Sequence, residues 1–135
     1  MDAAPEPTLT ILVVEDDVAV AELLRALLND VPGWGATVVH DAAAARAVFR
    51  HIQVEVLVLD VNLPGISGLE LLQLLRSDPE WRDPPVILVT ANPRQSGVPE
   101  TLEQGQAVRV IAKPFEVDEL LQAVRQAAAE YFARH

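Results

Sequence analysis

The chain has 135 residues, half of them apolar, no cysteine, and a formal net charge of −10 at pH 7. This length suits a single domain with a sizeable core, and the apolar content argues against disorder beyond the first few residues. A surface this acidic repels nucleic-acid phosphates and anionic membranes, so we expect neither as a partner. With no signal peptide, no membrane-spanning apolar stretch and no cysteine, we expect a cytoplasmic protein without disulfides or thiolate sites.

Apolar runs rich in β-branched residues alternate along the chain with helical patterns. This alternation is typical of βαβ units, so we predict an α/β fold with a parallel sheet covered on both faces. Residues 1–8 are expected to form a flexible N-terminus and residues 9–132 a single domain, with no output domain after it. We expect strands at 10–14, 36–40, 54–60, 86–89 and 108–112, and helices at 18–29, 42–49, from Gly68 onward, around 100–104 and at 116–132.

The last of these helices has the clearest amphipathic pattern. Its apolar positions recur at helical spacing and predict a face that packs on the sheet. The expected core-facing residues are Val117, Leu120, Leu121, Val124, Ala128, Tyr131 and Phe132. Trp34 and Trp81 lie among prolines and glycines, and we expect both in loops.

Polar residues stand at or just beyond the ends of four expected strands. Glu15 and Asp16 follow the first, Asp60 ends the third, Thr90 follows the fourth and Lys113 follows the fifth. Ligands of open parallel sheets bind beyond the carboxyl ends of the strands, so we expect these side chains to converge. Two carboxylates 4 Å apart repel by about 4 kcal/mol at an effective dielectric near 20, so a cation must compensate or one carboxyl must stay protonated. An all-oxygen ligand set favours a hard cation, above all Mg²⁺.

The same residues suit the chemistry of a phosphoryl group. Lys113 and a divalent cation could together neutralise an incoming phosphoryl group, and the Thr90 hydroxyl could donate to one of its oxygens. Asp60 stands alone at its strand end and is the natural nucleophile, which would form an aspartyl phosphate. Asp17 is interpreted instead as the N-cap of the first helix.

The residues around these positions resemble the receiver domains of bacterial two-component response regulators, of the stand-alone, single-domain type. The matching motifs, in order along the chain, are ILVVEDD at 11–17, LDVNLPGISG at 59–68, VTA at 89–91 and KPF at 113–115. The resemblance extends over nearly the whole chain. It implies a flavodoxin-like, doubly wound sheet of five parallel strands in the order 2-1-3-4-5, with five helices.

The resemblance also implies how the domain works. Asp60 would take a phosphoryl group from a phosphohistidine on a sensor histidine kinase, or exchange one with a histidine phosphotransfer protein. The phosphorylated form would alter binding to a downstream protein that the sequence does not identify. Such a domain is not an enzyme in the ordinary sense, since it assists only its own phosphorylation and dephosphorylation.

The resemblance assigns a role to each strand-end residue. Asp16 and Asp60 would ligate Mg²⁺ directly, Glu15 would act mainly through water, and the main-chain carbonyl of Asn62 would complete the protein ligands. Thr90 and Lys113 would bind the phosphoryl oxygens. The peptide bond between Lys113 and Pro114 is a candidate for the cis form.

One position departs from the family pattern. Val110 stands three residues before the lysine, where receiver domains usually carry Phe or Tyr, so the usual coupling between the threonine and an aromatic ring is not expected here. We hypothesise that the signal passes instead through ordering of residues 92–106.

Two other functions remain open at this stage. A phosphohydrolase of the haloacid dehalogenase type also uses an aspartate nucleophile, but it needs a second Asp as general acid where this chain has Asn62. A phosphate-independent interaction module is the other alternative, and Val110 is its best support. The histidines, His40 among them, lack metal-like spacing and are expected on the surface.

Overall fold

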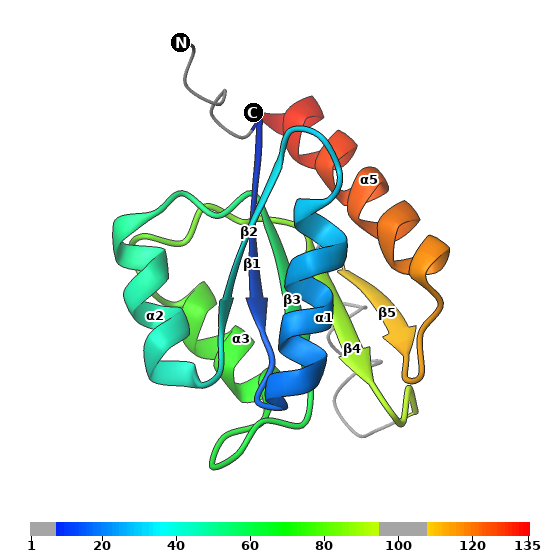
Figure 1. Cartoon of the computed structure of the whole chain (residues 1–135). Helices are drawn as coiled ribbons and strands as arrows, with labels where there is room; N and C mark the ends of the chain where they lie inside the picture. Colours follow the sequence, from blue (N-terminus) through cyan, green and yellow to red (C-terminus); the bar gives the residue numbers. More distant parts are fainter. Residues whose placement is uncertain (1–7, 95–107) are drawn as a thin grey trace, which may run out of the picture.

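The computed structural model describes residues 8–94 and 108–135. Strands and helices alternate along residues 8–90, as the sequence predicts, and a further strand and helix follow from residue 108 (Figure 1). The elements are β1 (Leu9–Val14), α1 (Val18–Asn29), β2 (Trp34–Val39), α2 (Ala42–His51), β3 (Val56–Asp60), α3 (Gly68–Arg76), β4 (Val86–Thr90), β5 (Val108–Ala112) and α5 (Val117–Arg134).

The strands form one parallel sheet in the order β2-β1-β3-β4-β5. This confirms the predicted flavodoxin-like, doubly wound fold. The described residues contain four of the five expected helices, and the helix expected around 100–104 lies outside them. No described helix combines the length and apolar character needed to cross a membrane.

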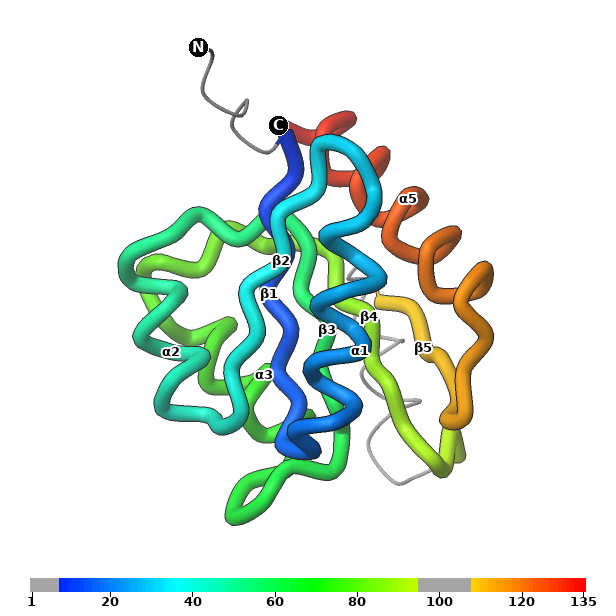
Figure 2. Tube along the Cα trace, in the orientation of Figure 1, coloured from blue at the N-terminus to red at the C-terminus, as the bar shows by residue number. Residues whose placement is uncertain are grey.

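The sheet separates two hydrophobic layers. The path of the strands and of the helices that cover them can be followed in the backbone trace (Figure 2). Side chains alternate between the two faces of a strand. In β1, Ile11 and Val13 pack with α1 and α5, whereas Leu12 and Val14 pack with α2 and α3. Because both faces are covered, every residue of β3 and β4 is buried, including Asp60 and Thr90 at their carboxyl ends.

Three helices begin with a side chain that caps their first turn. A capping oxygen satisfies a backbone N–H that has no partner inside the helix, and its loss costs about 1 kcal/mol. The prediction that Asp17 caps the first helix is confirmed. The caps and the N–H groups they accept from are Asp17 with Val20, Asp41 with Ala44, and Ser67 with Glu70.

The expectation that Trp34 lies in a loop is wrong. Gly33, with φ of +85°, forms the turn, and Trp34 then begins β2 by pairing with Leu9. Strand β2 therefore starts and ends earlier than the predicted 36–40. Trp81 does lie in the loop before β4, where its ring stacks on Phe49 of α2.

Other element bounds differ by a few residues. Helix α2 runs two residues beyond the predicted 42–49, and β3 starts two residues after the predicted position 54. Helix α5 begins after Glu116, and its outermost apolar residues, Val117 and Phe132, are 42% and 53% exposed. Ala123 and Ala127 are buried in addition to Leu120, Val124 and Tyr131, so the apolar stripe that faces the sheet also includes small residues.

Candidate functional site

The carboxyl ends of β1 and β3 bring three carboxylates together. One oxygen from each of Glu15, Asp16 and Asp60 lies within 4.8 Å of the others. Glu15 and Asp60 are buried, whereas Asp16 is exposed. We call these three residues the acidic cluster. It forms because β1 and β3 are parallel neighbours, with Val14 paired to Leu59, so that their carboxyl ends coincide.

The side chain of Lys113 enters the acidic cluster from the loop after β5. Its Nζ donates hydrogen bonds to Glu15 Oε1 at 2.8 Å and to Asp60 Oδ2 at 3.2 Å. The main-chain N–H of Lys113 donates to the carbonyl oxygen of Thr90 at 2.8 Å, which ties this loop to the end of β4. The peptide bond that follows, between Lys113 and Pro114, is cis.

The charge of the acidic cluster is only partly compensated. Burial raises the pKa of Glu15 to about 7, with a further rise from its neighbour Asp60, while the hydrogen bond from Lys113 opposes the change. Burial acts to lower the pKa of Lys113, but its bonds to Glu15 and Asp60 outweigh that effect and raise it. The ammonium of Lys113 thus bonds two of the three carboxylates, those of Glu15 and Asp60. Such an all-oxygen cluster with unneutralised charge fits a hard cation such as Mg²⁺.

Asp60 is held by contacts to both of its carboxylate oxygens. Oδ1 accepts a hydrogen bond from the main-chain N–H of Asn62 at 2.9 Å, and Oδ2 accepts from Lys113. The next residue, Val61, donates its N–H to the carbonyl oxygen of Val89. The Asn62 side chain is exposed. The carboxylate therefore has a defined orientation toward the acidic cluster.

Thr90 is fully buried at the end of β4, on the strand that neighbours β3. Its Oγ1 accepts a hydrogen bond from the main-chain N–H of Asn92 at 3.0 Å and lies 3.2 Å from the carbonyl oxygen of Asn92. These bonds tie the hydroxyl to the loop that follows. Val110 lies on β5, half-buried against the layer of α2 and α3.

His40 is exposed as predicted, but the structure gives it a contact that the sequence did not reveal. Its Nδ1 lies 3.0 Å from the carbonyl oxygen of Glu15, and the N–H of Glu15 donates to the carbonyl oxygen of Val39. This contact depends on the alignment of β1 with β2. No local motif signals such a long-range pairing.

Two hollows open beside the acidic cluster. One, of about 470 Å³, adjoins Asp16 and is bounded by the loop of residues 61–67. The other, of about 420 Å³, is mainly apolar and is lined by Val20, Leu23, Lys113, Pro114 and Phe115. The first hollow thus reaches the acidic cluster at Asp16, and the second reaches only its partner Lys113.

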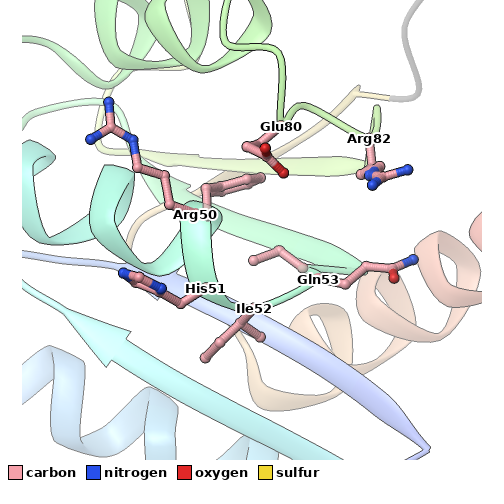
Figure 3. Close-up of a pocket in the computed structure, with 8 residues that line it drawn as sticks. Arg50, His51, Ile52, Gln53, Glu80 and Arg82 are labelled. Carbon is pink, nitrogen blue, oxygen red and sulfur yellow. The ribbon is translucent and has the colours of Figure 1, made fainter.

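A third hollow, of about 180 Å³, lies at the other end of the sheet, near the amino ends of β3 and β4 (Figure 3). Glu80 and Arg82 border it together, and Gln53 lies across from them, while the ring of His51 turns away. Its charges are mixed, in contrast to the acidic cluster. The lining residues are Phe49, Arg50, His51, Ile52, Gln53, Val54, Glu80 and Arg82.

The family model for the response regulator receiver domain matches residues 11–125. The chain belongs to the response regulator receiver domain family. Receiver domains are the phosphate-accepting modules of two-component signalling, and the acidic cluster of this receiver domain resembles the magnesium site of the family.

Relatives with known names support the same assignment. The receiver domain is 35% identical over 115 residues to the "DNA-binding response regulator MtrA" of Mycobacterium tuberculosis, covering 85% of this chain and 48% of that protein. It is 36% identical over 116 residues to the "Sensory transduction protein RegX3" of Mycobacterium bovis, covering 86% and 49%. The chain thus spans about half the length of these curated relatives.

Solved structures agree in fold. A putative response regulator from Chloroflexus aurantiacus is 31% identical, with a TM-score of 0.77 over 92% of this chain and 99% of that one. The receiver domain of a sensor histidine kinase from Pseudomonas aeruginosa is 26% identical, with a TM-score of 0.77 over 90% and 98%. That structure holds a magnesium ion coordinated in its active-site cleft.

Proposed function

We propose that this receiver domain accepts a phosphoryl group on Asp60 and thereby changes its binding to a downstream protein. The observation that carries the proposal is the acidic cluster, in which the buried carboxylate of Asp60 is hydrogen-bonded by Lys113 and lies with Glu15 and Asp16. A nucleophile, a cation site and a fixed ammonium are the groups that phosphoryl transfer needs. The domain proposed to carry this function comprises residues 9–132.

The donor would be a phosphohistidine of a sensor histidine kinase or of a histidine phosphotransfer protein. A carboxylate oxygen of Asp60 attacks phosphorus and forms a P–O bond as the P–N bond breaks. The electron pair of that bond stays on the imidazole nitrogen, which takes up a proton. The apolar hollow lined by the exposed Leu23 and the half-buried Phe115, beside Lys113, offers the donor protein contact area next to the acceptor.

Mg²⁺ fits the donor set of the acidic cluster. Asp16 and Asp60 would hold it directly, Glu15 through water, and Asn62 through its main-chain carbonyl. When bound, the ion neutralises charge on the phosphoryl oxygens and orients them. The carboxylate oxygens of this chain are hard ligands of the kind that Mg²⁺ prefers.

Lys113 and Thr90 would recognise the transferred group. Lys113 already donates a hydrogen bond to the Asp60 carboxylate. After transfer, its ammonium would donate to a phosphoryl oxygen instead. Thr90 would donate its hydroxyl to a second oxygen after leaving its bonds to Asn92. Because Val110 replaces the usual aromatic ring, the change would be passed on by another route. Residues 92–106, for which we proposed that role, lie largely outside the described residues.

Phosphorylation by acetyl phosphate tests the proposal. The chain is incubated with acetyl phosphate and Mg²⁺, and its intact mass is measured. We expect a single phosphoryl adduct on the wild type and none on Asp60→Asn. A wild type that forms no adduct would contradict the proposal. It would favour the phosphate-independent interaction module, which the replacement of the usual aromatic residue by Val110 supports.

A second assay separates the receiver from a phosphohydrolase. The chain is supplied with p-nitrophenyl phosphate and Mg²⁺, and released nitrophenol is followed. We expect no sustained turnover, because Asn62 stands where the phosphohydrolase needs its general acid. Sustained turnover that is lost in Asp60→Asn would show a phosphohydrolase instead.

A further inference from the structure

Gly68, the first residue of α3, lies against the main chain of the proposed phosphoacceptor. A Cβ atom at this position would lie 2.2 Å from the carbonyl oxygen of Asp60, 3.0 Å from its carbonyl carbon and 2.9 Å from Cα of Val61. All three atoms belong to the backbone, so no side chain can swing aside to make room. Any other residue at position 68 must push α3 and the end of β3 apart.

A comparison with Gly65 shows that space, not backbone conformation, demands glycine at position 68. Gly65 has φ of +79°, which favours glycine, but a Cβ there would meet nothing within 4 Å. Gly68 lies within a regular helix, where alanine has the higher intrinsic propensity. What alanine cannot satisfy at position 68 is the closeness of the helix to the main chain of Asp60 and Val61.

Two hydrogen bonds hold the segment between Asp60 and Gly68. The N–H of Gly68 donates to the carbonyl oxygen of Val61 at 2.8 Å. At the other end, the N–H of Asn62 donates to Asp60 Oδ1 at 2.9 Å. The loop is thus closed onto the end of β3, and its closure depends on how near α3 can come.

We propose that Gly68 is a positioning residue for phosphoryl transfer. By lacking a side chain, it lets the first turn of α3 lie against Asp60, and this contact sets the carboxylate in register with Asp16 and Lys113. It also places the carbonyl of Asn62, a proposed ligand of Mg²⁺. The inference rests on the proposed function of Asp60. It extends the residues needed for phosphoryl transfer to one that lies outside the acidic cluster.

The test compares Gly68→Ala with Ser67→Ala. Ser67→Ala removes the cap of the same helix, since Ser67 Oγ accepts from the N–H of Glu70, but it leaves the contact with Asp60 intact. It therefore controls for loosening of α3 as such. Each variant is measured for its Mg²⁺ dissociation constant, and for its rate constant and KM with acetyl phosphate.

For Gly68→Ala we expect the rate constant at saturating acetyl phosphate to fall about tenfold or more, with KM little changed. We expect Mg²⁺ to bind about tenfold more weakly. Ser67→Ala should stay within about twofold of wild type in all three quantities. The inference is overturned if Gly68→Ala matches wild type in rate and Mg²⁺ affinity, or if Ser67→Ala is impaired as much as Gly68→Ala.

Amide hydrogen exchange in the wild-type chain tests the same inference, and it remains possible even if Gly68→Ala does not fold. If Gly68 and Asp60 form one unit, Mg²⁺ should slow amide hydrogen exchange of Gly68 by about fivefold or more. The amide of Ile52, which follows α2, donates to the carbonyl oxygen of Val48 beside the hollow at the opposite end of the sheet and should not change. Unchanged exchange at Gly68 with Mg²⁺ bound overturns the inference. A wild type that binds Mg²⁺ but takes no phosphoryl group instead contradicts the proposed function of Asp60.

Discussion

At the amino-terminal end of the sheet, charged side chains pair with opposite charges, whereas at the carboxyl-terminal end carboxylates gather together. Near the amino ends of the strands, Arg134 bonds Asp83 at 3.3 Å and Arg50 lies 4.0 Å from Asp78. At the other end, Lys113 is the one cation that pairs with the acidic cluster among residues 8–94 and 108–135, through Glu15 and Asp60. Gathering like charges in a buried place costs stability, so the contrast marks the carboxyl-terminal end as the part shaped by function.

The largest effect should come from Asp60 itself. Asp60→Asn removes the nucleophile, and we expect phosphorylation by acetyl phosphate to fall below detection by intact mass. Asp83→Asn, at the opposite end of the sheet, is the matched control, because asparagine tolerates the positive φ of 55° found there. If Asp60→Asn forms as much adduct as the wild type, Asp60 is not the phosphoacceptor and the acidic cluster is not the site of phosphoryl transfer.

Loss of the single ammonium should come next. Lys113→Ala leaves the developing charge on the phosphoryl oxygens without a fixed cation, and we expect the phosphorylation rate to fall about 100-fold. Arg109→Ala, on the strand that precedes Lys113, is the control, because Arg109 pairs with Glu130 of α5 rather than with the acidic cluster. If Lys113→Ala is phosphorylated as fast as Arg109→Ala, the ammonium beside the acidic cluster has no part in phosphoryl transfer.

Removal of the divalent cation tests the function of the acidic cluster without a mutation. We expect EDTA to stop adduct formation by acetyl phosphate and added Mg²⁺ to restore it, because the carboxylates would otherwise repel the phosphoryl group. Intact mass before and after each addition gives the result. Formation of the adduct at an unchanged rate in EDTA would contradict the proposed ligand roles of Asp16 and Glu15.

Stability should respond to pH through Glu15. In metal-free protein, the pKa of Glu15 is raised from 4.5 to about 7, so the folded state holds a proton that the unfolded state has lost. Stability should therefore fall as pH rises from about 4.5 to 7, and Glu15→Gln should be more stable than wild type at pH 8 by about 1–3 kcal/mol. Urea unfolding at pH 5 and pH 8 in EDTA measures this. If the wild type instead gains stability relative to Glu15→Gln between pH 5 and pH 8, the pKa of Glu15 is not raised in the folded state.

The smallest effect should come from the paired charges. Arg134 and Asp83 form an exposed ion pair, so Arg134→Ala should cost about 0–1 kcal/mol in urea unfolding and leave phosphorylation unchanged. A larger loss of stability, or any loss of phosphorylation, would show that the amino-terminal end is coupled to the acidic cluster.

The sequence predicts most of the fold because its signals are local. β-branched runs identify the strands, and helical spacing identifies α1 with its observed bounds, Val18–Asn29. Parallel topology then brings Glu15, Asp16 and Asp60 to one end of the sheet. These inferences need only periodicity and the rule that parallel strands share their ends.

The features that the sequence does not predict depend on distant contacts. Trp34 begins a strand because Leu9 lies beside it, and the ring of His40 meets Glu15 because β2 pairs with β1. Phe132 has helical spacing but lies beyond the area that the sheet covers. The fit of Gly68 against Asp60 exists only after α3 has packed. No window of neighbouring residues contains this information.

The role of Asp60 as phosphoacceptor is tested most directly by locating the phosphoryl group. The chain is phosphorylated with acetyl phosphate and Mg²⁺, the acyl phosphate is reduced with labelled borohydride, and the labelled residue is identified by peptide mapping. We expect a single label, at position 60. A label at Glu15, at Asp16 or at a carboxylate of the opposite end, with position 60 unlabelled, would contradict it.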